Sequence, residues 1–171
     1  MVLKMEQNQL ISKKEASMKQ ERQISDFLGW RRVSGSGARP NTPGDIESSD
    51  WLGECKTHVT ANHKIHFDDK IWNKIADEAA SKFKRPAYFV DDGSQRLSRT
   101  WVLFPMQDTP LDVMEYAYPD CKGSINFETA YMKQHILNTI TGTKFTKLVY
   151  KVKLSNKFLM MADLDTFKEF I

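Results

Sequence analysis

The chain has 171 residues, a net charge of +3 and 40% apolar residues. This length fits one compact domain with a small appendage, and the apolar fraction excludes a disordered chain. No apolar stretch approaches the ~18 residues that cross a bilayer, so we expect no membrane span and no membrane partner. The first residues lack the apolar core of a secretory signal and two cysteines make no disulfide scaffold, so we expect a cytoplasmic protein.

Positive charge is concentrated near the start of the chain. Residues 1–40 hold eight lysines and arginines against four acidic residues, whereas residues 107–171 hold eight of each. A basic first quarter suits contact with a polyanion, although an excess of four charges is equally typical of a solvated face.

The predicted elements begin with an N-terminal segment that lacks clear periodicity. We expect a flexible arm over residues 1–14 and a helix that begins near Ser12 and ends at Leu28. Gly29 directly follows and is a typical residue for stopping a helix.

A helical wheel of this segment places an acidic residue on its apolar stripe. Met18, Ile24 and Leu28 lie on one face, and Glu21 falls near the middle of that face. The pattern therefore predicts a carboxylate where the helix should be dry. The alternative is an ordinary helix-edge carboxylate paired with Arg22 or Lys19.

The chain then alternates between strand and helix patterns. In chain order we expect a strand over 30–33, a turn-rich loop over 34–44, strands over 45–47 and 51–57 joined as a hairpin, a helix that starts at Asp68 or Asp69 and stops before Pro86, and strands over 87–90 and 100–104. This order predicts an α/β fold with a mixed sheet flanked by helices.

Aromatic residues in these elements are expected to pack inside the protein. Trp72 and Phe83 recur at helical spacing and are predicted to lie in the core. Trp30, Trp51 and Trp101 are also assigned to packing, with a position bordering DNA as the alternative for each. After Pro105 the patterns weaken. We expect a helix within 127–140, a strand around 148–152 and a short last helix from Asp163 or Asp165, as an extension over residues 106–171 that packs on the core.

The most informative pattern is Asp45, eight intervening residues, and then Glu54-Cys55-Lys56. Side chains two apart on a strand share a face, so Glu54 and Lys56 project together and Cys55 points to the other side. If Asp45 lies on the neighbouring strand, its carboxylate stands beside Glu54. Two carboxylates with water suit Mg²⁺, beside which Lys56 can orient a nucleophilic water. The alternative is a cross-strand ion-pair group on a solvated sheet face.

This pattern resembles the signature of the PD-(D/E)XK nuclease superfamily. Around it, Glu21-Arg22 in the first helix, Arg32 at the end of the first strand and the loop Ser34-Gly35-Ser36-Gly37 resemble the archaeal-type Holliday-junction resolvases and their phage-encoded relatives, over roughly residues 15–105. The resemblance implies a restriction-endonuclease-like fold with an αβββαβ core. The short hairpin and the 66 residues after Pro105 depart from the minimal family.

The resemblance also implies a role for each matching residue. Asp45 and Glu54 would bind the metal, with the backbone carbonyl of Cys55 and the carboxylate of Glu21 as further ligands, and Lys56 would be the catalytic lysine. Ser36 would contact the scissile region, although it can also be simple turn filler. The residues expected to contact DNA are Arg22, Arg31, Arg32, Ser34, Arg39 and Lys64, and Lys74 extends this patch.

The sequence therefore predicts a Mg²⁺-dependent, structure-selective DNA endonuclease, with Mn²⁺ able to substitute. By resemblance it would be a homodimeric resolvase that hydrolyses phosphodiesters in four-way DNA junctions. The alternatives are a nuclease of the same fold that acts on duplex, flap or single-stranded DNA, and an inactive DNA-binding module. The spacing of Cys55, His58, His63 and His66 also permits a zinc site, but alternation turns Cys55 away.

Overall fold

The computed structural model describes the backbone of residues 2–35 and 42–171, and the side chains from residue 12 onward within these ranges. The helices are α1 (Val2–Leu28), α2 (Asp69–Ser81), α3 (Thr129–Ile140) and α4 (Leu164–Phe167), with 3₁₀ helices η1 (Leu97–Arg99) and η2 (Lys168–Phe170). The strands are β1 (Arg31–Arg32), β2 (Ile46–Glu47), β3 (Trp51–Lys56), β4 (Ile65–Asp68), β5 (Arg85–Asp91), β6 (Thr100–Pro105), β7 (Val113–Ala117), β8 (Ser124–Phe127), β9 (Lys147–Leu154) and β10 (Lys157–Asp163).

Eight of the described strands form one mixed sheet in the order β1-β2-β3-β5-β6-β10-β9-β7. The pairs β3/β5 and β7/β9 are parallel and the other neighbours are antiparallel. Strands β4 and β8 form a separate antiparallel ribbon. The prediction of a mixed sheet flanked by helices is confirmed, and the strands after Pro105 extend this same sheet through the β6/β10 pair.

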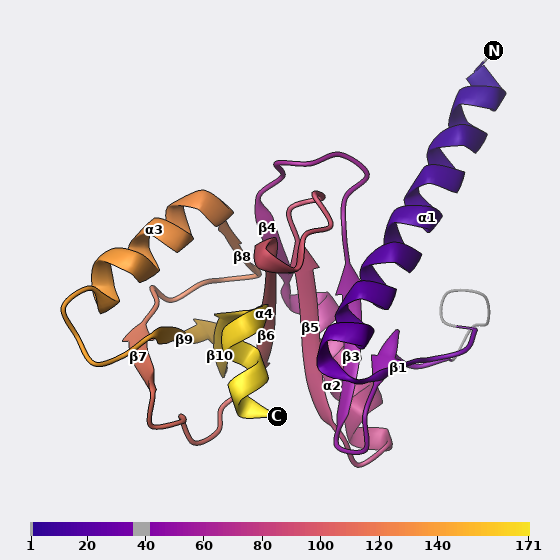
Figure 1. Cartoon of the computed structure of the whole chain (residues 1–171). Coiled ribbons are helices and arrows are strands. Elements are labelled where there is room, and N and C mark those ends of the chain that lie inside the picture. Colours follow the sequence, from indigo (N-terminus) through magenta and orange to yellow (C-terminus); the bar gives the residue numbers. More distant parts are fainter. Residues whose placement is uncertain (1, 36–41) are drawn as a thin grey trace.

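The two faces of the sheet are covered by different elements, which are visible in Figure 1. On one face, α2, the β4/β8 ribbon and α3 bury an apolar cluster that includes Trp72, Phe67 and Met132. On the other face, α1 and α4 bury a second cluster that includes Ile24 and Phe167. Both sides of the central strands are therefore dry, which explains why β5 and β6 read as short continuous apolar runs.

Helix α1 begins at Val2, ten residues before the predicted start at Ser12, and ends at Leu28 as predicted. Residues 2–11 are mostly strong helix formers such as Leu, Met, Lys, Glu and Gln, which favour a helix without an apolar stripe. Figure 1 shows this end of α1 projecting beyond the sheet. Among the described residues, no helix is both long and apolar enough to cross a membrane.

The buried row of α1 differs from the predicted stripe. Ala16, Gln20 and Ile24, spaced by four residues, are buried, whereas Met18 is 42% exposed. Residues four apart lie one above the other on a helix, so this row is the ridge that packs on the sheet. Glu21 is half-buried at the edge of the row.

Helix α2 confirms most of its prediction and corrects one part of it. Asp68 caps the helix by accepting a hydrogen bond from the Lys70 backbone N–H at 2.7 Å, and Trp72 is buried. The prediction that Phe83 lies in the core on this helix was wrong, because the helix ends at Ser81 and Phe83 is 98% exposed with φ +56°. Beyond the last turn, helical spacing no longer fixes where a side chain points.

The three tryptophans assigned to packing are buried, as predicted: Trp30, Trp51 and Trp101. Strands β4, β7, β8 and β10 were not predicted. In β4, buried Ile65 and Phe67 alternate with the more exposed His66 and Asp68. That alternation was a usable strand signal, although its partner strand β8 lies about 60 residues further along the chain.

Candidate functional site

The β2/β3 hairpin brings the two predicted acidic residues to the same edge of the sheet. The register pairs Ile46 with Gly53, and the Asp45 N–H donates to the Gly53 carbonyl at 2.7 Å. Continuing this register places Asp45 opposite Glu54. Because β2 begins only at Ile46, the N–H of Cys55 donates to Oδ2 of Asp45, at 2.8 Å. The Asp45 carboxylate is thereby held at the β3 backbone next to Glu54.

Two glycines allow this close approach. A Cβ at Gly53 would lie 2.7 Å from the ring of Phe89 and 2.8 Å from Ile46, so the hairpin packs at this point only without a side chain. Gly44 has φ +67°, where glycine carries no steric cost, and its N–H donates to Glu78 Oε2 at 3.1 Å. The chain therefore enters β2 in a fixed direction, with Asp45 facing β3.

Alternation along β3 places Glu54 and Lys56 on the face covered by α2 and turns Cys55 into the opposite apolar cluster, as predicted. Glu54 is buried, and its Oε1 accepts a hydrogen bond from Lys56 Nζ. Its Oε2 lies 3.5 Å from Nζ of Lys74 on α2. Each oxygen of this carboxylate therefore faces a lysine, which compensates for removing its charge from water.

Glu21 faces the same site from α1. The pKa of Glu21 is raised to about 7, first by burial and then by the negative charge of Asp45, while Arg32, Lys56 and a hydrogen bond with Ser17 oppose these effects. The repulsion by Asp45 indicates that the two carboxylates share one electrostatic environment. A carboxyl group with a pKa near neutrality in such a setting is typical of functional sites.

Lys56 is fixed through both its backbone and its side chain. Its carbonyl accepts a hydrogen bond from Gln20 Nε2 at 2.8 Å, which joins α1 to the end of β3. Burial lowers the pKa of Lys56, but Glu54 and then Asp45 outweigh burial, so the pKa is raised. The side chain is an ammonium ion at neutral pH and acts as a hydrogen-bond donor and a positive charge rather than as a base.

These side chains line one cavity of about 980 Å³ between α1, the β1–β2 segment, β3 and α2. Figure 1 shows the C-terminal part of α1 beside these strands. The described residues that line it are Lys13, Lys14, Ser17, Met18, Glu21, Arg32, Val33, Ser34, Gly35, Thr42, Gly44, Asp45, Glu54, Cys55, Lys56 and Lys74. Three acidic residues and Lys56 thus lie in a cavity whose rim carries four further basic residues, Lys13, Lys14, Arg32 and Lys74.

The structure brings together most, but not all, of the residues singled out in the sequence. Eight of the predicted metal-binding, catalytic or DNA-contacting residues line the cavity: Glu21, Arg32, Ser34, Asp45, Glu54, Cys55, Lys56 and Lys74. Arg22 is exposed elsewhere on α1, Arg31 pairs with Glu47 at 2.7 Å, and Lys64 is exposed in the loop after β3. Ser36 and Arg39 lie outside the described residues.

The structure adds residues that the sequence reasoning missed. Lys13, Lys14 and Ser17 line the cavity from positions eight, seven and four residues before Glu21. Helical periodicity counted back from Glu21 was the signal that could have found them. Gln20 carries no such signal, because its contact with Lys56 depends on how α1 packs against β3.

The donor set was compared with the metals considered from the sequence. Among the described residues, no three His, Cys, Asp or Glu side chains form a group that could hold a metal ion. This result applies to the zinc site considered from the sequence, because its Cys55 is buried in the apolar cluster. It applies equally to the set of Glu21, Asp45 and Glu54, which does not form a three-ligand group. Mg²⁺ usually takes only one or two protein carboxylates and keeps several waters, so Asp45 and Glu54 fit it as a pair.

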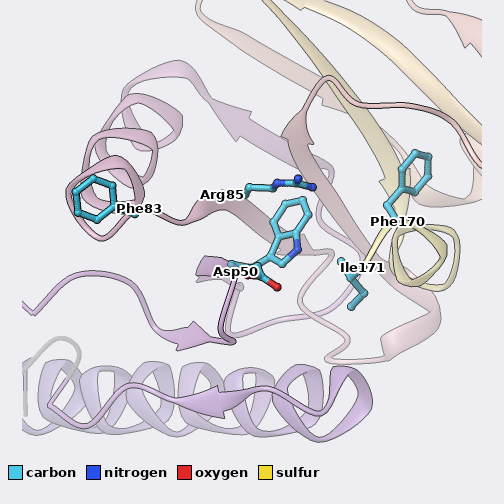
Figure 2. Close-up of a pocket in the computed structure, with 6 residues that line it drawn as sticks. Asp50, Phe83, Arg85, Phe170 and Ile171 are labelled. Atoms are coloured by element: carbon cyan, nitrogen blue, oxygen red, sulfur yellow. The ribbon is translucent and has the colours of Figure 1, made fainter.

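A second, smaller hollow of about 260 Å³ lies at the other end of β3. Figure 2 shows Arg85 beside this hollow, with Phe170 and Ile171 to one side and Phe83 apart from them. The Arg85 guanidinium lies 5.6 Å from the centre of the Trp51 ring, a cation–π contact that packs the surface. Its single carboxylate, Asp50, has no second acid beside it in the lining, so this hollow lacks the paired groups of the larger cavity.

The chain matches no protein-family model, and no curated protein or solved structure matches it. The interpretation of the cavity therefore rests on its residues and their contacts. The class that these features define is a mixed α/β protein with paired acidic residues and a lysine in a basic-rimmed cavity.

Proposed function

We propose that this protein is a Mg²⁺-dependent DNA endonuclease with a restriction-endonuclease-like fold, and that it resolves four-way DNA junctions. The observation that carries the proposal is the convergence of Asp45, Glu54 and Lys56 in one cavity, with Glu21 facing them from α1. The element order α1, β1, β2, β3, α2, β5 also follows the αβββαβ core of that fold, apart from the inserted β4.

The proposed metal ligands are the carboxylates of Asp45 and Glu54 and the backbone carbonyl of Cys55, while Glu21 faces them from α1 without completing a group of three carboxylates. When bound, Mg²⁺ would supply a polarised water as nucleophile and neutralise charge on the phosphate. Hard oxygen donors and a partly hydrated ion suit Mg²⁺, and Mn²⁺ accepts the same ligands.

The chain's own residues provide the remaining chemistry. Lys56, held as an ammonium ion, donates hydrogen bonds within the cavity and favours the negative charge that grows on the phosphate during hydrolysis. Arg32, Lys13, Lys14 and Lys74 on the rim would bind backbone phosphates on either side of the reacting one. Hydrolysis by water requires no covalent enzyme intermediate.

The proposed assembly is a homodimer. Resolving a four-way junction requires cuts in two opposed strands, and two copies related by a two-fold axis would present two cavities in the matching arrangement. This part of the proposal rests on the resemblance noted in the sequence.

The test is a cleavage panel of a four-way junction, a flap, a duplex and a single strand of identical sequence, with Mg²⁺ and with EDTA. We expect junction cleavage only with metal. Glu54→Ala and Lys56→Ala should each lower the rate about 10²-fold or more, while junction binding stays within about threefold, because the basic rim holds the backbone. Lys70→Ala, at an exposed position on α2, is the matched control and should cut normally.

Other results would change the proposed substrate or refute the proposed activity. Equal cutting of the plain duplex would replace the resolvase by a general nuclease of the same fold. Binding without cleavage at any enzyme concentration would leave an inactive DNA-binding module. Turnover retained by either catalytic-site variant would refute the roles given to Glu54 and Lys56.

A further inference from the structure

The loop of residues 57–64, between β3 and β4, carries a pair of stacked histidines outside the catalytic cavity. The imidazole rings of His58 and His63 lie 4.2 Å apart between centroids, at 19° to each other. His63 is exposed, whereas His58 is half-buried beneath it. We call residues 57–64 the His loop. It presents an aromatic ring to solvent with a second ring as its support.

Hydrogen bonds hold the His loop in place. The Thr57 hydroxyl donates to Oδ1 of buried Asp91 at 2.5 Å, and the His63 N–H donates to the Asp92 carbonyl at 2.9 Å. The Thr60 hydroxyl hydrogen-bonds to Nε2 of His63 at 2.7 Å. The His63 ring therefore has a fixed position although it is exposed.

Close packing adds to these bonds. A Cβ at Gly93, in the turn after β5, would lie only 1.9 Å from the Thr60 carbonyl oxygen and 3.0 Å from the Cβ of His58. Figure 1 shows the loop between β3 and β4 arching over this turn, beside α1. An aromatic side chain held in this way loses little conformational entropy when a ligand stacks on it.

The His loop continues directly from the catalytic cavity. Lys56 lines the cavity and is the residue before the loop, and Lys13 on the rim lies near enough to affect His58. Burial lowers the pKa of His58, and the charges of His63, His66 and Lys13 lower it further. The lowered pKa favours a neutral His58 ring, which is suited to support His63 by stacking.

We propose that His63, supported by His58, is a stacking platform for an unpaired base of the DNA strand that leaves the cavity across Lys13 and Lys14. This rests on the proposed function and narrows its substrate to DNA with an unpaired or splayed nucleotide beside the cut. Bases inside a duplex are already stacked and paired, whereas at a branch a base can turn onto an aromatic side chain. The two lysines would hold the adjoining phosphates.

The experiment measures binding of the full-length chain to branched DNA and to single-stranded DNA by fluorescence anisotropy in EDTA, which prevents cleavage. His63→Ala should weaken binding about fivefold to tenfold, the lower range for one base on one aromatic side chain. His63→Phe should bind within about twofold of the wild type, and His63→Lys should be as weak as His63→Ala. His66→Ala changes an exposed histidine outside the stack and is the matched control.

An abasic scan locates the stacked base. At one position of the strand, an abasic site should weaken wild-type binding as much as His63→Ala does. Combining that abasic site with His63→Ala should weaken binding no further than either change alone. Tight binding by His63→Lys with weak binding by His63→Phe would show a charge contact and overturn the proposal.

The outcomes separate this inference from the proposed function. If His63→Ala binds and cleaves DNA as the wild type does, the stacking platform is overturned and the proposed function stands. Binding that depends on His63 without any cleavage would support the platform and refute the hydrolase. Absence of DNA binding by the wild type would overturn both, and thermal melts of each variant would confirm that it is folded.

Discussion

Glu47→Gln tests the ion cluster that holds the β2/β3 hairpin of the candidate site together. Glu47, the last residue of β2, is buried, and its Oε1 accepts a hydrogen bond from Arg31 at 2.7 Å. Its Oε2 lies 2.6 Å from Nζ of Lys84 and 3.6 Å from Nζ of Lys82. This carboxylate joins β1, β2 and the segment before β5, so its neutralisation should loosen the hairpin that carries Asp45.

The expected loss follows from the exposure of each partner. Arg31 is 78% exposed, so its pair contributes about 0–0.5 kcal/mol, and the longer contact to Lys82 adds a similar amount. Lys84 is only 15% exposed and also donates to the Ser48 carbonyl at 2.6 Å, so its charged hydrogen bond to Glu47 contributes about 1.5–2 kcal/mol. Glu47→Gln should therefore lower the free energy of unfolding by about 1.5–3 kcal/mol, which corresponds to about 3–12 °C in Tm.

The loss should also depend on pH. The hydrogen bond from Lys84 is the main reason that the pKa of Glu47 lies below 4.5, burial opposes it, and the charges of Lys82, Lys84 and Arg31 lower the pKa further. A carboxyl group with a lowered pKa in the folded state stabilises the protein above its unfolded pKa, and this stability is lost as pH falls through the folded value. The difference between wild type and Glu47→Gln should be full at neutral pH and shrink below about pH 4.5.

The assay is urea unfolding followed by tryptophan fluorescence, at neutral pH and at about pH 3. Glu115→Gln is the matched control, because Glu115 pairs with Lys151 at 2.5 Å but both side chains are about 40% exposed. This exposed pair should contribute less than about 1 kcal/mol. The reasoning would be refuted if both variants lost the same free energy of unfolding, or if the loss in Glu47→Gln did not change with pH.

Two further predictions concern the candidate site and the core. Burial and the charge of Asp45 raise the pKa of Glu21 to about 7, so cleavage should rise as pH passes through about 7 and Glu21 gains a negative charge beside the proposed metal pair. Glu21→Gln should remove this step and slow cleavage about tenfold in a rate-against-pH series, and an unchanged profile would exclude Glu21 from the site. Trp72→Ala should cost about 3–5 kcal/mol in urea unfolding and Phe83→Ser less than about 0.5 kcal/mol, and comparable losses would contradict the exposed position of Phe83.

The candidate site was only partly predictable from sequence. Asp45, Glu54 and Lys56 could be placed together because strand alternation and a short hairpin are local rules, and the register that brings Asp45 opposite Glu54 follows from them. Lys74 completes the surroundings of Glu54 from α2, and Gln20 holds the Lys56 carbonyl from α1. These contacts depend on where two helices pack, which no spacing within β3 contains.

The sequence by itself determined the local conformations: the cap of α2 at Asp68, the end of α1 at Leu28 and the hairpin with its acidic residues. Each of these depends on residues within one or two turns. Only the tertiary structure decided which surfaces meet. It paired β4 with the distant β8, exposed Phe83 beyond the end of its helix, and fixed the stacked histidines beside the cavity. The periodicity of apolar residues indicates which side of a helix or strand is buried, whereas long-range packing determines which other element covers that side.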